Sequence, residues 1–312
     1  MITTLLKVNQ LFVSAILVGL SLLGLFLLFN EDLVAMPQLI SFILVAILFV
    51  SVAGYNQVVD FVKKSHFIVF FYLMFILNFL EDLGDISFYS GYFFLSLIFF
   101  QMLDGKDFSK KIFNPFDFGF FGCIMLPIHP PFIIFFVAII FHFIMMGRTQ
   151  VSALISCFLG ILTGSFLWIE IIFIFDLQDF FYLQLGQLDS LKKIEFHESS
   201  NYYYFAPILG LSLFSLVDYF QNINRQKTEK KIIFTNILML LFASAFYLYF
   251  FGKSSKNFLV LALPLSLLLS NFSLHGAKVR REIIVWLVVL SFSLYQISRH
   301  IELIQILNTV RF

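Results

Sequence analysis

Pro115-Phe116-Asp117-Phe118-Gly119-Phe120-Phe121-Gly122 begins the stretch of sequence that decides the fold. An apolar run continues to Leu126, and Pro127-Ile128-His129-Pro130-Pro131 interrupts it before a second apolar run from Phe132 to Met146. Proline cannot continue a helix and biases the preceding residue away from helical angles. The stretch therefore predicts a helical hairpin with a proline corner.

The composition places this hairpin in a membrane. Of 312 residues, 60% are hydrophobic and only 12% are charged, and the mean hydropathy is +0.95. A soluble globular protein of this length is far less apolar. The net charge of +1 argues against nucleic acid as a partner. The two cysteines, Cys123 and Cys157, lie in apolar runs without metal-binding spacing and are interpreted as small buried hydrophobes.

The hydrophobic pattern predicts an all-α polytopic transmembrane helix bundle with about eleven spans. One integral-membrane domain covers residues 1–312, with an N-terminal helical half (1–175) that contains the hairpin region (115–175), an external loop with an amphipathic helix (176–202) and a C-terminal helical half (203–312). The expected spans besides the two hairpin runs are 11–29, 38–52, 66–80, 89–103, 151–175, 205–220, 232–251, 258–272 and 283–298.

The distribution of lysine and arginine predicts the orientation. With a cytoplasmic N-terminus and an external C-terminus, fourteen of the 20 basic residues fall in cytoplasmic segments. This multi-pass topology places two acidic segments and the proline corner together on the external face. Those segments hold Glu31, Asp32, Glu81 and Asp82.

These four carboxylates are the candidate catalytic residues. If they converge over the corner, they supply a general base or ligands for a divalent cation such as Mg²⁺ or Mn²⁺. The alternative is that they are ordinary loop charges, kept outside because basic residues are kept inside. The metal, if any, is unknown, and no cofactor is evident.

Five further residues are candidate substrate-binding groups. Glu170 lies inside an apolar run, where a carboxylate is costly unless it is neutral, paired or in a wet cavity, although it also lies near the end of its span. His129 is a candidate base or a turn residue at the corner. Three basic residues are candidates for contact with phosphate: Arg148, Lys192 and Lys193.

Familiar enzyme motifs are absent from the sequence. It contains no GxxxxGK[ST], GxGxxG, HExxH or GxSxG segment. This argues against a nucleotide-driven pump and a zinc protease.

A family resemblance rests on Asp117-Phe118-Gly119-Phe120-Phe121-Gly122, the proline corner, Arg148-Thr149 and Leu159-Gly160-Ile161-Leu162-Thr163-Gly164. These segments resemble the core of an uncharacterised bacterial membrane-protein family, domain of unknown function 6427, over most of the chain. Over about 60 residues they are similar, more distantly, to the multispanning GT-C glycosyltransferases. The first helical half is therefore expected to be GT-C-like. The loop from Asn30 to Pro37 is shorter than in those enzymes, and they often carry an external domain that this chain lacks.

The resemblance implies a bacterial cytoplasmic (inner) membrane protein that handles polyprenyl-phosphate-linked sugars in envelope glycan assembly. In GT-C enzymes an acidic residue of the first external loop is the base or metal ligand, and Glu31 and Asp32 match it by position. If this chain is an enzyme, it is a glycosyltransferase with a lipid-linked donor, and membrane lipid is a partner. Two alternatives stay open: a non-catalytic accessory subunit that binds envelope proteins, and a transporter with Glu170 as the coupling carboxylate.

Overall fold

The computed structural model describes residues 18–24, 26, 36–58, 65–80, 82–103, 115–145, 151–186, 188, 205–222, 226, 228–252, 254–275 and 278–310. These residues form helices and contain no β-strand. The labelled elements are α3 (Met36–Val58), α4 (Phe67–Phe79), α5 (Ile86–Leu103), α6 (Pro115–Ile128), η3 (Pro130–Phe132), α7 (Ile133–Met145), α8 (Val151–Phe175), α9 (Gln178–Gly186), α10 (Ala206–Asn222), α11 (Thr228–Phe251), η7 (Ser255–Leu261), α12 (Ala262–His275) and α13 (Lys278–Val310).

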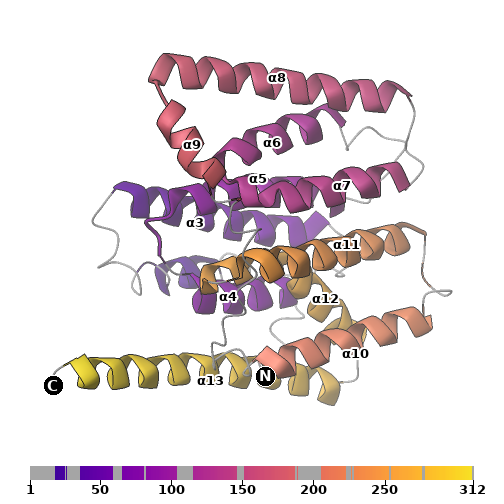
Figure 1. Cartoon of the computed structure of the whole chain (residues 1–312). Coiled ribbons are helices and arrows are strands. Elements are labelled where there is room, and N and C mark those ends of the chain that lie inside the picture. Colours follow the sequence, from indigo (N-terminus) through magenta and orange to yellow (C-terminus); the bar gives the residue numbers. More distant parts are fainter. Residues whose placement is uncertain are drawn as a thin grey trace.

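Most helices are stacked in layers, with their axes roughly along one direction (Figure 1). The packing passes from α8 to α6 and α5, then through α3 and α4 to α12, and ends at α10 and α13. In the second half of the chain, α11 packs against α7 and α12. The central helices α4 and α12 therefore have neighbours on several sides, whereas α8 lies at one edge.

Five helical segments of the described chain are long and apolar enough to cross a membrane: Met36–Gly54, Val151–Phe175, Lys230–Phe251, Ser255–Leu274 and Lys278–Ser298. Four shorter apolar segments accompany them: Phe67–Phe79, Ile86–Met102, Pro115–Ile128 and Pro130–Phe141. The all-helical class is confirmed. The count of about eleven crossings stays a prediction, and most of the expected first span, 11–29, lies outside the described residues.

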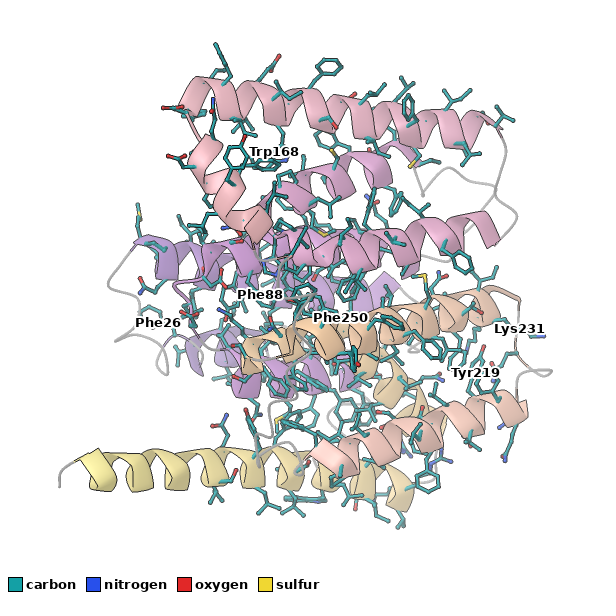
Figure 2. All side chains as sticks on the ribbon, viewed as in Figure 1. Phe26, Phe88, Trp168, Tyr219, Lys231 and Phe250 are labelled. Atoms are coloured by element: carbon teal, nitrogen blue, oxygen red, sulfur yellow. The ribbon has the colours of Figure 1, made fainter. Side chains whose placement is uncertain are left out.

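The centre of the bundle is packed with aromatic rings (Figure 2). Phe79 of α4 is 1% exposed, and its ring centroid lies 4.9 Å from that of Phe205, 5.3 Å from Phe258 and 5.8 Å from Tyr295. Stacked and tilted ring contacts at these distances stabilise a core beyond simple burial. Many of the phenylalanines that the composition shows are thus packing residues.

Buried serines of α12 satisfy their hydroxyls within their own helix. Ser266, Ser270 and Ser273 each donate to the carbonyl oxygen four residues earlier. This back-bonding allows a small polar side chain to remain in an apolar core without an unpaired donor. A compact α12 can therefore pack closely among its neighbours.

The proline corner that the sequence predicts joins α6 to α7, with one difference in its details. Pro127 lies inside the last turn of α6, and the helix ends at Ile128. Pro130 and Pro131 then begin the short η3 helix that leads into α7. The Phe136 ring of α7 packs against Phe118, at 5.7 Å between centroids, and fills the space above Gly122. α6 nevertheless packs mainly against α8, and α7 mainly against α11.

Candidate functional site

Two neighbouring carboxylates in the turn before α5 converge on one lysine. Lys256 Nζ, on η7, lies 2.6 Å from Asp82 Oδ2 and 2.7 Å from Asp85 Oδ2. Asp82 has a φ of 48°, a left-handed conformation that aspartate adopts more readily than most residues. Asp85 also accepts a hydrogen bond from the Phe88 backbone amide at 3.0 Å, and so caps the start of α5.

The pKa of Asp85 reflects this double engagement. Burial raises the pKa, but hydrogen bonds from Lys256 and the Phe88 amide outweigh it, and the net result is a lowered pKa. Asp85 is therefore an ionised partner of Lys256 at neutral pH rather than a general base. Among the described residues, no group of three or more His, Cys, Asp or Glu side chains is arranged to hold a metal ion.

His129 at the proline corner belongs to a buried chain of hydrogen bonds. Its Nε2 lies 3.3 Å from the Tyr247 hydroxyl, which donates to Asn257 Oδ1 at 3.1 Å. The Asn257 amide in turn donates to the Phe251 carbonyl oxygen. Because the Tyr247 proton goes to Asn257, this arrangement favours a His129 tautomer that carries its proton on Nε2. The chain joins the corner to α11 and η7.

His129 is held neutral. Burial lowers its pKa to about 4, which the nearby Asp85 carboxylate only partly opposes. Phe88 and Phe132 pack edge-on against the imidazole, at 5.6 and 4.5 Å between ring centroids. No described group bonds to Nδ1. A neutral histidine in this position acts as a fixed hydrogen-bonding element of the corner.

A third contact ties α9 to the same end of the bundle. The Ser87 hydroxyl of α5 bonds to the Ile128 carbonyl oxygen and lies 2.9 Å from Gln184 Oε1 of α9. Gln184 is buried, whereas Phe180, Tyr182 and Leu183 are exposed. The helix predicted after Asp176 is present as α9. Its side chain buried against the protein is Gln184 rather than an apolar residue. We call these residues together the polar cluster: Asp82, Asp85, Ser87, His129, Gln184, Tyr247, Lys256 and Asn257.

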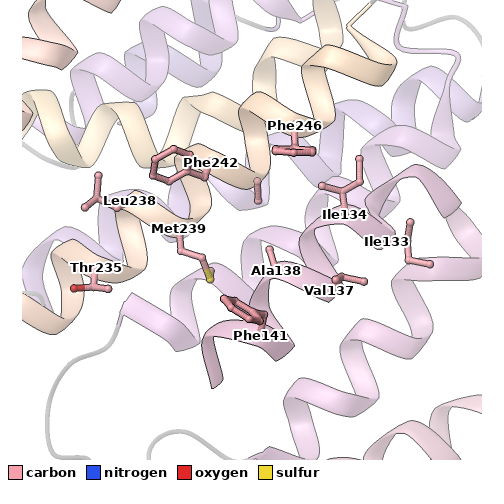
Figure 3. A pocket seen from close by; sticks show the side chains of 11 residues that line it. Ile133, Ile134, Val137, Ala138, Phe141, Thr235, Leu238, Met239, Phe242 and Phe246 are labelled. Atoms are coloured by element: carbon pink, nitrogen blue, oxygen red, sulfur yellow. The ribbon is translucent and has the colours of Figure 1, made fainter. Parts of the chain in front are cut away.

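An apolar groove runs between α7 and α11 (Figure 3). Its volume is about 830 Å³, within the range of about 300–1,000 Å³ typical of ligand sites. Ala138 and Ala243 lie among larger side chains along it. The lining residues are Ile133, Ile134, Val137, Ala138, Phe141, Thr235, Leu238, Met239, Phe242, Ala243 and Phe246.

The two walls of the groove contact each other beside the polar cluster. Tyr247 is one turn beyond Ala243 on α11, and its ring lies 5.3 Å from that of Phe132, the residue before Ile133. The hydrogen bond from His129 to Tyr247 therefore joins the two walls where they meet. The other end, near Phe141 and Thr235, lies toward the start of α11.

The predicted site residues fall in three different places. Asp82 and His129 belong to the polar cluster. Glu170 lies on the exposed face of α8. The other candidates lie outside the described residues: Glu31, Asp32, Glu81, Arg148, Lys192 and Lys193.

Sequence reasoning did not single out Asp85, Tyr247, Lys256 or Asn257. Asp85 is in the same acidic segment as Asp82, and its position directly before a helical run is a signal for an N-cap. No comparable signal marks the other three, because their partners lie 10 to 174 residues away in the chain.

A glycine seam holds α8 against α6. A methyl group at Gly160 would overlap the Phe116 carbonyl oxygen, and one at Gly119 would overlap the Cys157 carbonyl oxygen. Four residues beyond Gly160, a Cβ on Gly164 would meet Cys123 Cβ at 2.9 Å. This is the close approach of backbones that glycines four residues apart allow in membranes. The Leu159–Gly164 segment is thus a packing motif.

Comparison with known proteins identifies the chain's family. A model described as a family of unknown function (DUF6427) matches residues 1–305. No curated protein and no solved structure matches the chain. The glycines, the proline corner and the first-half helices that carried the resemblance all lie within the matched range. This protein belongs to the DUF6427 family.

Proposed function

We propose that this protein handles a lipid-linked substrate whose hydrocarbon chain lies in the α7–α11 groove. The groove is the observation that carries the proposal, because it is apolar along its length and belongs to membrane-compatible helices. The substrate class we propose is a polyprenyl-phosphate-linked sugar of envelope glycan assembly. The proposed location is the bacterial cytoplasmic membrane, with the N-terminus inside.

The shape of the groove supports a chain-like ligand. Bulky residues such as Phe141, Phe242 and Phe246 border it, and Ala138 and Ala243 leave room between the two helices. Among the lining residues that the structure describes, Thr235 is the polar one, and it lies at one end. Such a surface has no groups to orient a polar ligand along its length, but it suits a long hydrocarbon chain.

In this proposal the polar cluster fixes the distance between the groove walls. His129 joins the α7 side to Tyr247 on α11, and Asn257 joins Tyr247 to η7. Buried hydrogen bonds of this kind are costly to leave unpaired, so they favour one spacing of the helices. A preformed groove binds its ligand without a free-energy cost for rearranging the helices.

Any glycosyl transfer would need a general base or a metal site. Both described carboxylates of the cluster, Asp82 and Asp85, are paired with Lys256. The proposed catalytic role therefore stays with Glu31 and Asp32, which match the first external loop of a GT-C-like half by position, and with Glu81 of the second acidic segment.

The test is retention of a polyprenyl phosphate by the full-length protein in detergent micelles, followed by native mass spectrometry. Ala138→Trp fills the groove and is expected to lower bound lipid at least about tenfold. Ala206→Trp, at an exposed position of α10, is the matched control. Equal retention by both variants and the wild type would reject the groove as the binding site.

The second candidate function is a non-catalytic accessory subunit, and the exposed face of α8 favours it. Leu159, Thr163, Phe166, Glu170 and Phe173 are all exposed and follow alternating four- and three-residue steps. Such steps form one seam for a partner helix. A threonine and a carboxylate on an otherwise apolar seam supply the polar contacts that join membrane helices.

Electrophoresis of the native complex in mild detergent tests this second candidate. Glu170→Leu is expected to release the chain from its assembly, and Glu170→Gln, which keeps hydrogen bonding, is expected to retain it. The accessory function is rejected if the wild-type chain migrates as a monomer or if Glu170→Leu leaves the complex intact.

A further inference from the structure

The end of the groove opposite the polar cluster carries a basic residue in line with the groove. Lys231 is one helical turn before Thr235, the lining residue nearest the start of α11. Four residues advance a helix by about 6 Å and by slightly more than one full turn, so the two positions share a face. Figure 2 shows Lys231 at one end of α11 and Phe250 toward the other end.

This part of α11 keeps its shape independently of the Lys231 side chain. The Thr235 hydroxyl donates to the Lys231 carbonyl oxygen at 2.9 Å, within the helix. Lys231 forms no ion pair with any carboxylate that the structure describes, unlike Arg280, which lies 3.5 Å from Asp218. The Lys231 ammonium group, one turn beyond the last lining residue, therefore has no counter-charge among the carboxylates that the structure describes.

We infer that the groove takes its lipid with the phosphate at Lys231 and the hydrocarbon chain directed toward His129. This inference deepens the proposed function and rests on it. A cation at one end of an apolar channel complements a lipid whose only charge is at one end of its chain. At the opposite end the rings of Phe132 and Tyr247 are in contact, at 5.3 Å between centroids, and this apolar contact offers no charge to a head group.

The inference also assigns a leaflet. Basic residues are concentrated on the cytoplasmic side of membrane proteins, and the segment before α11 and its first turn carry Arg225, Lys227, Lys230 and Lys231. A phosphate at Lys231 is then in the cytoplasmic leaflet. The protein would thus take its lipid phosphate from the inner side, where the candidate external carboxylates cannot reach it without further movement of the lipid.

The experiment compares three probes on full-length protein in zwitterionic nanodiscs: a polyprenyl phosphate, the uncharged polyprenol of the same chain, and inorganic phosphate. Binding is measured by native mass spectrometry after titration. The wild type is expected to bind the lipid phosphate about tenfold more tightly than the alcohol, as one charge-assisted contact implies. Inorganic phosphate is expected not to compete at millimolar concentration.

Variants then locate the charge. Lys231→Gln is expected to remove the preference for the phosphate while leaving polyprenol binding unchanged, and Lys231→Arg is expected to keep it. Lys278→Gln, at an exposed lysine that begins α13, is the matched control. The inference is overturned if Lys231→Gln keeps the preference, if Lys278→Gln abolishes it equally, or if inorganic phosphate competes as well as the polyprenyl phosphate.

Failure of the inference and failure of the proposed function give different results. If the groove does not hold the chain, Ala138→Trp leaves polyprenol binding unchanged, which rejects both. If the groove holds the chain but the phosphate lies elsewhere, Ala138→Trp abolishes polyprenol binding and Lys231→Gln has no effect on the preference.

Discussion

The helix α8 at the edge and the segment of η7 and α12 at the centre are both apolar, yet the protein buries them very differently. In Val151–Phe175 only 11% of the most apolar stretch is buried, at a hydropathy of 2.1, whereas in Ser255–Leu274 the share is 72% at a hydropathy of 1.7. The more apolar helix is thus the more exposed one. In a membrane, lipid accepts apolar side chains as well as a protein core does, so hydropathy marks a span but not its place in the bundle.

The two regions also hold their neighbours by different means. At the centre, large aromatic rings such as Phe79 pack against one another. At the edge, α8 and α6 approach closely because Gly119 and Gly160 have no side chains. Removing volume should therefore damage the centre, and adding volume should damage the edge. Substitutions in both regions test this contrast, and the polar cluster between them sharpens it.

The largest effect is expected from Phe79→Ala at the centre. It removes a ring that is 1% exposed and leaves a cavity, at a cost of about 3–5 kcal/mol in the free energy of unfolding. Phe173→Ala on α8 removes the same atoms where the ring is 83% exposed, and should cost less than about 0.5 kcal/mol. Denaturant unfolding in micelles measures both free-energy changes. Similar changes for the two variants would contradict the contrast between centre and edge.

Gly160→Leu should detach α8 and leave the centre folded. Forcing a side chain into the Phe116 backbone costs about 1–3 kcal/mol. A disulfide cross-link measures the contact between α8 and α6. It joins Cys123 to a cysteine introduced by Ser165→Cys, in a chain that also carries Cys157→Ser, because Cys123 Sγ lies 3.2 Å from Ser165 Oγ. The cross-link should form readily when Gly160 is retained and poorly when it is replaced by leucine.

The matched control for that variant is Gly210→Leu on α10. A Cβ at Gly210 meets nothing within 4 Å, so the cross-link yield should stay unchanged. A high yield in Gly160→Leu would mean that α8 does not depend on the glycine seam.

Lower pH should decrease the free energy of unfolding through His129, which hydrogen-bonds the proline corner to α11. Its folded pKa of about 4 is below the ordinary value of 6.5, so between these pH values the unfolded chain binds a proton that the folded chain does not. Stability should therefore rise with pH across this window, by at most about 1.4 kcal/mol per pH unit from this group. Thermal unfolding from about pH 4 to 7 measures the slope.

His129→Gln should flatten that slope, because the substituted side chain does not titrate. Asp85 affects stability only at more acidic pH. Its pKa is lowered, so the carboxylate keeps its stabilising charge until the pH falls below the usual range for aspartate. An unchanged slope in His129→Gln would assign the acid sensitivity to other groups.

The smallest effect is expected from Lys256→Met, at about 1 kcal/mol in the free energy of unfolding. Asp82 is 63% exposed and can return to water, so most of the cost comes from Asp85 at 28%. Lys278→Met, at an exposed position, should cost almost nothing. A loss above that of Gly160→Leu would mean that the ion pairs, rather than packing, dominate this end of the bundle.

Helix positions were predictable from the sequence to a large degree. The expected spans 38–52, 66–80, 89–103 and 151–175 correspond to α3, α4, α5 and α8, since a run of apolar residues must satisfy its backbone internally. The corner at His129 was likewise predictable from its prolines. The candidate site was less so: Asp82 and His129 were expected, but their partners Lys256 and Tyr247 were not.

The sequence by itself determined that this chain is an apolar helical protein of the DUF6427 family, because composition, run length and proline placement act locally along the chain. Only the tertiary structure decided which helices are central, that Gly160 meets α6, that Lys256 pairs with Asp85 and that α7 and α11 enclose a groove. Each of these depends on contacts between residues far apart in sequence. Lipid and protein interior attract apolar side chains about equally, so hydrophobic pattern cannot choose among such contacts, and shape and hydrogen bonding do.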